Sequence, residues 1–130
     1  MLFFAGLIAI VVAIVHSVLG ERLLFSRMRV AGVIPTNGYP LLRERHVRIL
    51  WATWHLVSVF GVAIGASLLI IDRADSVLSS MRVVLWSVIV MMTLGALLVC
   101  VATRGRHPGW LGLGAVALLT FGHLQALSSV

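Results

Sequence analysis

Four long apolar runs constrain this chain more than any other feature. They cover residues 2–19, 47–71, 81–102 and 110–127, and each approaches or exceeds the roughly 20 residues that an α-helix needs to cross a hydrocarbon core of about 30 Å. A segment inside a bilayer must satisfy its own backbone polar groups, which a helix does. The runs therefore predict an all-α fold: a four-helix transmembrane bundle, alone or as an oligomer, that forms one domain over residues 1–130.

Composition agrees with a membrane protein and argues against a nucleic-acid-binding one. Hydrophobic residues make up 61% of the chain and charged residues only 11%, whereas roughly a quarter of a soluble domain is charged. The formal net charge is +6, but in a chain this apolar we expect the arginines at loops and lipid headgroups. The expected partner is the lipid bilayer with its anionic headgroups, and not a nucleic acid.

The arginines are distributed unevenly between the predicted loops. Most of them flank or fill the first loop, residues 20–46, and two more lie in the third, whereas the second loop has two aspartates around its arginine. By the positive-inside rule, the first and third loops face the cytoplasm. Both termini are therefore predicted to lie on the outer side.

The first loop begins with "ERLLFSRMRV", residues 21–30, in which apolar side chains alternate with basic ones. This pattern is typical of a short amphipathic helix on the membrane surface. We expect Arg22, Arg27 and Arg29 to face anionic headgroups.

Small residues predict close helix contacts. Gly61 and Gly65 form a small-xxx-small pair in the second run, and Gly112 and Gly114 lie early in the fourth. All four suit the close backbone approach of membrane helices.

One histidine interrupts each of three apolar runs. His16 precedes Arg22 by six residues and His55 follows Arg48 by seven, which corresponds to about 9 and 10 Å along helices that rise about 1.5 Å per residue. The two imidazoles should therefore lie at one level of the cytoplasmic half, on neighbouring helices. His123 falls in the outer half, and no role is predicted for it.

Ionisable side chains inside a membrane are costly and usually mark a function or a partner. A neutral imidazole keeps a lone pair for a metal and suits Fe, Cu and Zn. The pattern favours a metal- or haem-binding protein, which would be redox-active with Fe or Cu. The predicted residues are His16 and His55 as ligands of the cofactor, Trp54 as a wall of its pocket, and Glu21, His46 or His107 as further metal ligands.

Two alternatives stay open. In a small accessory or structural subunit of a larger membrane complex, each histidine would bond a neighbouring hydroxyl, for which Ser17, Thr53, Ser58 and Thr120 are candidates. In a proton-coupled or solute-conducting protein, Glu21, Arg22 and His107 would lie at the cytoplasmic mouth. Four short helices leave little room for a pathway, so this alternative requires an oligomer.

Three segments carry a resemblance: "HSVLGERLL" at 16–24, "RILWATWHLVSV" at 48–59 and "RHPGWLGLGAVAL" at 106–118. With its H-S-x-x-G-E and W-H elements, the chain resembles an uncharacterised family of small bacterial four-helix integral membrane proteins. That resemblance implies a multi-pass protein of a bacterial inner membrane, so the termini that the arginines place on the outer side would be periplasmic. The chain is more weakly similar to four-helix membrane b-type cytochromes, which implies at most one haem per subunit because only three runs hold a histidine.

Overall fold

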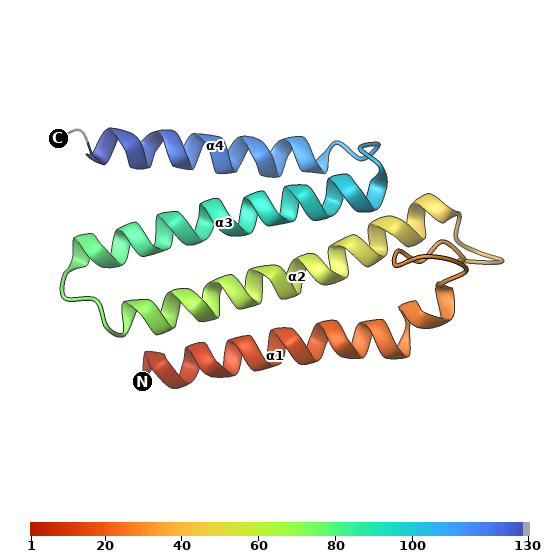
Figure 1. Ribbon diagram of the computed structural model, residues 1–130, viewed down its shortest axis with the longest axis horizontal. Coiled ribbons are helices and arrows are strands. Elements are labelled where there is room, and N and C mark those ends of the chain that lie inside the picture. The colour runs from red at the N-terminus through yellow and green to blue at the C-terminus, as the bar shows by residue number, and fades with distance from the viewer. Residues whose placement is uncertain (129–130) are drawn as a thin grey trace.

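The computed structural model describes residues 1–128 and consists of four long α-helices that run back and forth (Figure 1). They are α1 (Leu2–Leu23), α2 (Glu44–Ile71), α3 (Val77–Thr103) and α4 (Gly109–Ser128), and a 3-10 turn, η1 (Phe25–Met28), follows α1. All four α-helices are long and apolar enough to cross a membrane. The predicted all-α fold with four helices of spanning length is confirmed.

The helices extend beyond the apolar runs because hydropathy does not mark where backbone hydrogen bonding stops. α1 continues through Glu21 and Arg22, and α2 begins at Glu44. Such charged side chains reach water at a helix end while their backbone stays helical. α3 begins at a capping box, in which the Ser76 hydroxyl accepts from the Ser79 amide at 3.1 Å and the Ser79 hydroxyl accepts from the Ser76 amide at 3.2 Å.

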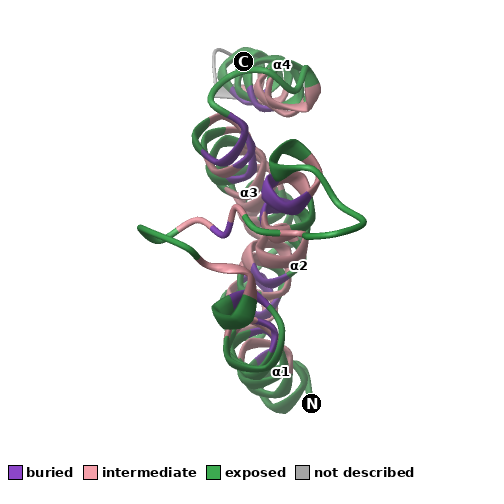
Figure 2. Ribbon diagram, turned by 90° about the vertical axis from the view of Figure 1, so that its right-hand side faces the viewer, coloured by how far each residue is buried: buried purple, intermediate pink, exposed green. Residues whose placement is uncertain are grey.

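The four helices lie side by side in a single row and do not close into a bundle. Each helix packs on the next one along the chain, and α1 and α4 lie at opposite ends of the row (Figures 1 and 2). Between 11% and 17% of the most apolar 18-residue window of each helix is buried. Both broad faces of the row are therefore apolar and uncovered. A site can form only where neighbouring helices meet or where the helices begin and end.

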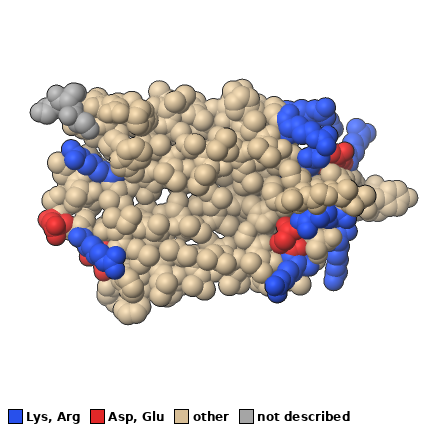
Figure 3. Space-filling view, viewed as in Figure 1, with Lys and Arg blue, Asp and Glu red and all other residues tan. Residues whose placement is uncertain are grey.

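The α-helices begin and end at two opposite ends of the molecule, and these two ends differ in charge. Most of the arginines gather at the end that carries η1, the following segment and the α3–α4 turn, while the opposite end holds Asp72 and Asp75 together with Arg73 and Arg82 (Figure 3). Met1 and the end of α4 lie at this second end (Figure 1). We call the first the arginine-rich end.

The segment after α1 is not the surface helix that the sequence predicted for residues 21–30. Residues 21–23 complete α1, η1 is a single 3-10 turn, and the chain is extended at Arg29. Phe25 is only 1% exposed and lies against the rings of Trp54 and His55. Burial of this large side chain at the α1–α2 contact turns the segment back onto the helices instead of along the membrane surface.

Glycines bring α1 and α2 close together. A Cβ atom at Gly65 would lie 2.7 Å from the Gly6 carbonyl oxygen, and one at Gly61 would lie 2.9 Å from a side chain of α1. The predicted close approach is confirmed for this pair. Within the chain, Gly112 and Gly114 make no such approach, because an added Cβ at either would meet no atom within 4 Å.

Candidate functional site

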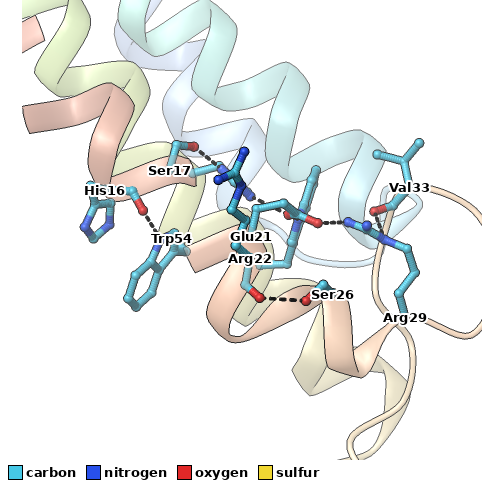
Figure 4. A network of polar contacts seen from close by, with 10 residues as sticks. His16, Ser17, Glu21, Arg22, Ser26, Arg29, Val33 and Trp54 are labelled. Carbon is cyan, nitrogen blue, oxygen red and sulfur yellow. Dashed lines mark hydrogen bonds and ion pairs between the residues drawn. The ribbon is translucent and has the colours of Figure 1, made fainter. Parts of the chain in front are cut away.

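A cluster of polar and aromatic side chains lies where α1 meets α2, towards the arginine-rich end (Figure 4). Its members come from the last turns of α1, from η1 and the residue after it, and from the first half of α2. We call it the His55 cluster, and it consists of His16, Ser17, Glu21, Phe25, Arg29, Trp51, Trp54 and His55.

His55 lies between a hydroxyl and a carboxylate, both contributed by α1. Its Nδ1 is 2.5 Å from the Ser17 hydroxyl oxygen, and its Nε2 is 3.4 Å from Oε2 of Glu21. A carboxylate can only accept, so the tautomer that serves both contacts carries its proton on Nε2 and accepts from Ser17 at Nδ1. The Glu21 contact is an ion-pair distance without hydrogen-bond geometry, and Nε2 is buried with no hydrogen-bond partner.

Two donors hold Glu21 in place. The Arg29 guanidinium donates to Oε1, and the Trp51 indole N–H donates to Oε2 at 3.2 Å. Arg29 also donates from Nε to the Val33 carbonyl at 2.9 Å, which closes the turn after η1 (Figure 4). The carboxylate is therefore oriented and its charge is compensated before His55 adds any proton.

Arg29 consequently does not face the headgroups as the sequence predicted. Its guanidinium is folded onto the cluster, with a side-chain exposure of 29%. Arg22 and Arg27 are exposed. Of the three arginines predicted to contact lipid headgroups, these two have exposed side chains.

His16 has a different environment from His55. Its ring stacks on Trp54 with centroids 4.4 Å apart and planes 8° apart, and the Trp54 indole donates to the His16 carbonyl at 3.1 Å. The side chains of His16 and Ser17 leave α1 in different directions (Figure 4). Nε2 of His16 is buried without a hydrogen-bond partner.

The predicted placement of His16 and His55 at one level of neighbouring helices is confirmed, because Ser17, the residue after His16, contacts His55 directly. Of the other proposed ligands, Glu21 lies beside His55, whereas His46 and His107 line a separate cavity at the arginine-rich end. His123, for which no role was predicted, is exposed on α4 at the far side of the row. Over residues 1–128, no three His, Cys, Asp or Glu side chains come close enough together to hold one metal ion.

Four members of the cluster were not predicted as cofactor or metal residues. Ser17 was expected only as a possible hydroxyl partner of a histidine and Arg29 only at the lipid headgroups, and neither Phe25 nor Trp51 was expected at the site. A usable signal was present in the spacing. Ser17 and Glu21 are four residues apart on α1, as Trp51 and His55 are on α2, so each pair shares one helix face.

In this arrangement of hydroxyl, imidazole and carboxylate, a proton can move between the Ser17 hydroxyl and the His55 imidazole. Serine hydrolases use the same order of groups, but they also need free donors for an oxyanion. Both indole N–H groups of the cluster are already bonded, that of Trp51 to Glu21 and that of Trp54 to the His16 carbonyl. Proton transfer is therefore the chemistry that the cluster offers most directly.

No protein-family model, no curated protein and no solved structure matches this chain. The resemblance to small four-helix membrane proteins therefore stays a prediction.

Proposed function

We propose that this protein transfers protons in the membrane and that His55 is the group that takes up and releases the proton. The observation that supports this function is the contact of His55 with Ser17 on one ring nitrogen and with Glu21 on the other. Imidazole is the side chain suited to gain and lose a proton near neutral pH. A histidine held between two proton-exchanging groups is a common element of proton relays in membranes.

Protonation of His55 has a defined consequence for its partners. In the neutral tautomer described above, Nδ1 accepts from the Ser17 hydroxyl; in the imidazolium, both nitrogens are donors. The Ser17 hydroxyl must then turn round and accept. The Glu21 carboxylate, although it also pairs with Arg29, attracts the added charge and reduces the cost of placing it in a membrane interior. Each proton that His55 binds thus reverses one hydrogen bond between α1 and α2.

The proposal includes an orientation. We infer a bacterial inner membrane with the arginine-rich end in the cytoplasm and both termini in the periplasm. The unequal charge of the two ends supports this orientation (Figure 3). The cluster would then exchange protons with the cytoplasmic side.

The proposal also includes an oligomer. A single row of helices encloses no path across the membrane, because both of its broad faces are open. We propose that a second copy of the chain packs over the line where α1 meets α2. The two copies would then enclose the part of the proton path that continues beyond Ser17. The buried hydroxyl of Ser58, one turn from His55 and without a hydrogen-bond partner, is the next proton-exchanging group along α2.

Proton flux into liposomes tests the function. Purified protein is reconstituted with a pH-sensitive dye inside, and a potassium diffusion potential drives protons inward. We expect wild-type flux well above that of empty liposomes and a return to that background in His55→Ala. His123→Ala is the matched control, since it removes a histidine from α4 outside the cluster, and it should keep wild-type flux.

Two results would refute proton transfer through His55. One is a wild-type flux no faster than that of empty liposomes. The other is an equal loss of flux in His55→Ala and His123→Ala. Helical content and monodispersity in detergent, measured on every variant, separate loss of function from loss of fold.

A second function, binding of a metal or haem, has its own supporting observation. The Nε2 atoms of both His16 and His55 are buried without a hydrogen-bond partner, on facing helices. A neutral imidazole with a free nitrogen suits Fe, Cu and Zn, and His55 would then carry its proton on Nδ1 and donate it to Ser17. The close contact of α1 with α2 at Gly61 leaves no width for a haem plane between the two helices. A haem would therefore need a second copy of the chain, and a metal ion would need a further ligand from one, because no three His, Cys, Asp or Glu side chains over residues 1–128 lie close enough together.

An optical spectrum with elemental analysis tests this second function on detergent-purified protein. A Soret band or about one metal ion per chain, lost in both His16→Ala and His55→Ala, would support it. Protein that stays free of cofactor after incubation with haem and with Fe, Cu and Zn would refute it.

A further inference from the structure

A cavity of about 600 Å³ opens at the arginine-rich end, outside the His55 cluster. It lies between the first turn of α2 and the turn that joins α3 to α4. Its charged lining consists of one carboxylate, Glu44, and five guanidinium groups, from Arg43, Arg45, Arg48, Arg104 and Arg106. In Figure 3 this region is part of the dense group of basic side chains at the arginine-rich end.

The positive charge of the cavity is not balanced from within. Glu44 contacts two of the arginines, Arg48 at 2.7 Å and Arg104 at 3.8 Å. Among the residues that the structure describes, the other three, Arg43, Arg45 and Arg106, have no carboxylate within ion-pair distance. An anion entering the cavity would therefore meet cations that have no internal counter-ion.

The floor of the cavity is rigid. Arg48 is only 8% exposed, and it donates from Nη1 to the Ala102 carbonyl at 3.1 Å and from Nε to Glu44. These bonds tie the first turns of α2 to the last turn of α3. A guanidinium held in this way loses little conformational entropy when it binds an anion.

The α3–α4 turn presents its two arginines through a specific backbone conformation. Arg104 has φ 54° and Gly105 has φ 73°, so the chain reverses within a few residues of the end of α3. The Trp110 indole donates to the Gly105 carbonyl at 3.2 Å, and the Gly109 amide donates to Nδ1 of His107 at 3.1 Å. These bonds hold the turn against the start of α4, and its two arginines flank Gly105.

The first turn of α2 also attracts anions, more weakly than the arginines do. Arg43, the residue before the helix, makes no side-chain hydrogen bond to cap it. The His46 and Val47 amides donate to the Arg43 carbonyl, at 2.8 and 3.3 Å, which leaves the Glu44 and Arg45 amides for an external acceptor. The helix dipole favours an anion there.

We propose that this cavity binds the phosphate group of an anionic ligand. Guanidinium groups suit phosphate because they donate paired hydrogen bonds in a planar fork. The ligand can be the headgroup of an anionic phospholipid, since the cavity lies at the end of spanning helices, or a soluble phosphate. This site uses none of the residues of the proton-transfer proposal and does not depend on it.

Lipid titration followed by native mass spectrometry tests the site on detergent-purified protein, with phosphatidylglycerol and phosphatidylcholine as probes. We expect the first bound phosphatidylglycerol to have a Kd about tenfold lower than phosphatidylcholine, and Arg43→Gln with Arg106→Gln to remove roughly that difference. Both arginines are exposed, so the double variant should fold. The matched control, Arg73→Gln with Arg82→Gln, removes two charges from the opposite end and should change the Kd less than twofold.

Calorimetric titration with inorganic phosphate and pyrophosphate separates the two sources. Binding of phosphatidylglycerol alone, sensitive to the first double variant, assigns the site to a lipid headgroup. Binding of the inorganic anions with the same sensitivity assigns it to a soluble phosphate. The proposal is overturned if no anion binds more tightly than phosphatidylcholine, or if both double variants weaken binding equally, because bulk charge would then explain the attraction.

Discussion

The contacts at the two ends of the helix row are made differently. Between α1 and α2, glycines bring the backbones together, and Ser17, Glu21, Trp51, Trp54 and His55 form hydrogen bonds or ion pairs across the contact. Between α3 and α4, the packing includes an apolar edge-to-face pair of Trp86 and Phe121 with centroids 6.3 Å apart. Glycines of α4 such as Gly114 face open space.

This difference follows from what holds helices together in lipid. Lipid chains are as apolar as leucine, so apolar side chains gain little by facing another helix, and close packing and polar bonds decide which helices associate and in which register. The α1–α2 contact has both, whereas α3 and α4 pack through side chains, with Trp110 and Leu113 against Val99 and Ala102 and with no glycine of either helix against the other's backbone. We therefore expect α1–α2 to be the more sensitive contact to substitution, in both stability and function.

The largest difference should appear for added volume at the glycines. Gly65→Val would place a Cβ 2.7 Å from the Gly6 carbonyl oxygen, so α1 must move away from α2. We expect a loss of about 2–3 kcal/mol in the free energy of unfolding. Gly114→Val, in open space on α4, should change it by less than about 0.5 kcal/mol. Reversible unfolding in mixed detergent and SDS measures both, and equal losses would show that the two contacts are equally tight.

Removal of the charge at Glu21 should have the next largest effect. Glu21→Gln leaves Arg29 without its anion and weakens the contacts with Trp51 and His55. We expect a loss of about 1–2 kcal/mol in the same assay, together with slower proton flux. Asp75→Asn makes the same chemical change at an exposed position of the other end and should alter neither quantity. Unchanged stability in Glu21→Gln would mean that the cluster does not hold α1 on α2.

The smallest effect should come from single hydroxyl groups. Ser17→Ala removes the 2.5 Å contact with His55 and should cost about 0.6 kcal/mol, the typical value of a polar bond between membrane helices. Thr120→Ala in α4 removes a hydroxyl that bonds only the Val116 carbonyl of its own helix, at 2.8 Å, and should cost less. In liposomes, Ser17→Ala should slow proton flux less than His55→Ala. A larger stability loss in Thr120→Ala than in Ser17→Ala would reverse the comparison.

The sequence predicted correctly the features that depend only on position along the chain. Helix number and type followed from run length, and the shared level of His16 and His55 followed from residues counted from flanking arginines. Sequence-based predictions were inaccurate where neighbours in space mattered. Burial of Phe25 replaces the predicted surface helix with a short 3-10 turn. Of the four glycines predicted to suit close helix contacts, only Gly61 and Gly65 make one within the chain.

Hydropathy and charge alone therefore determined that this chain forms four spanning-length helices with one arginine-rich end, because the cost of unbonded backbone in lipid leaves few other structures. Only the tertiary structure decided that the helices form a row, that His55 contacts Ser17 and Glu21 while His16 stacks on Trp54, and that His46 and His107 line a separate arginine-rich cavity. The physical reason is that neighbouring positions on a helix point about 100° apart. The rotation and spacing of each helix against the next, set by small residues and polar bonds, therefore choose which side chains meet.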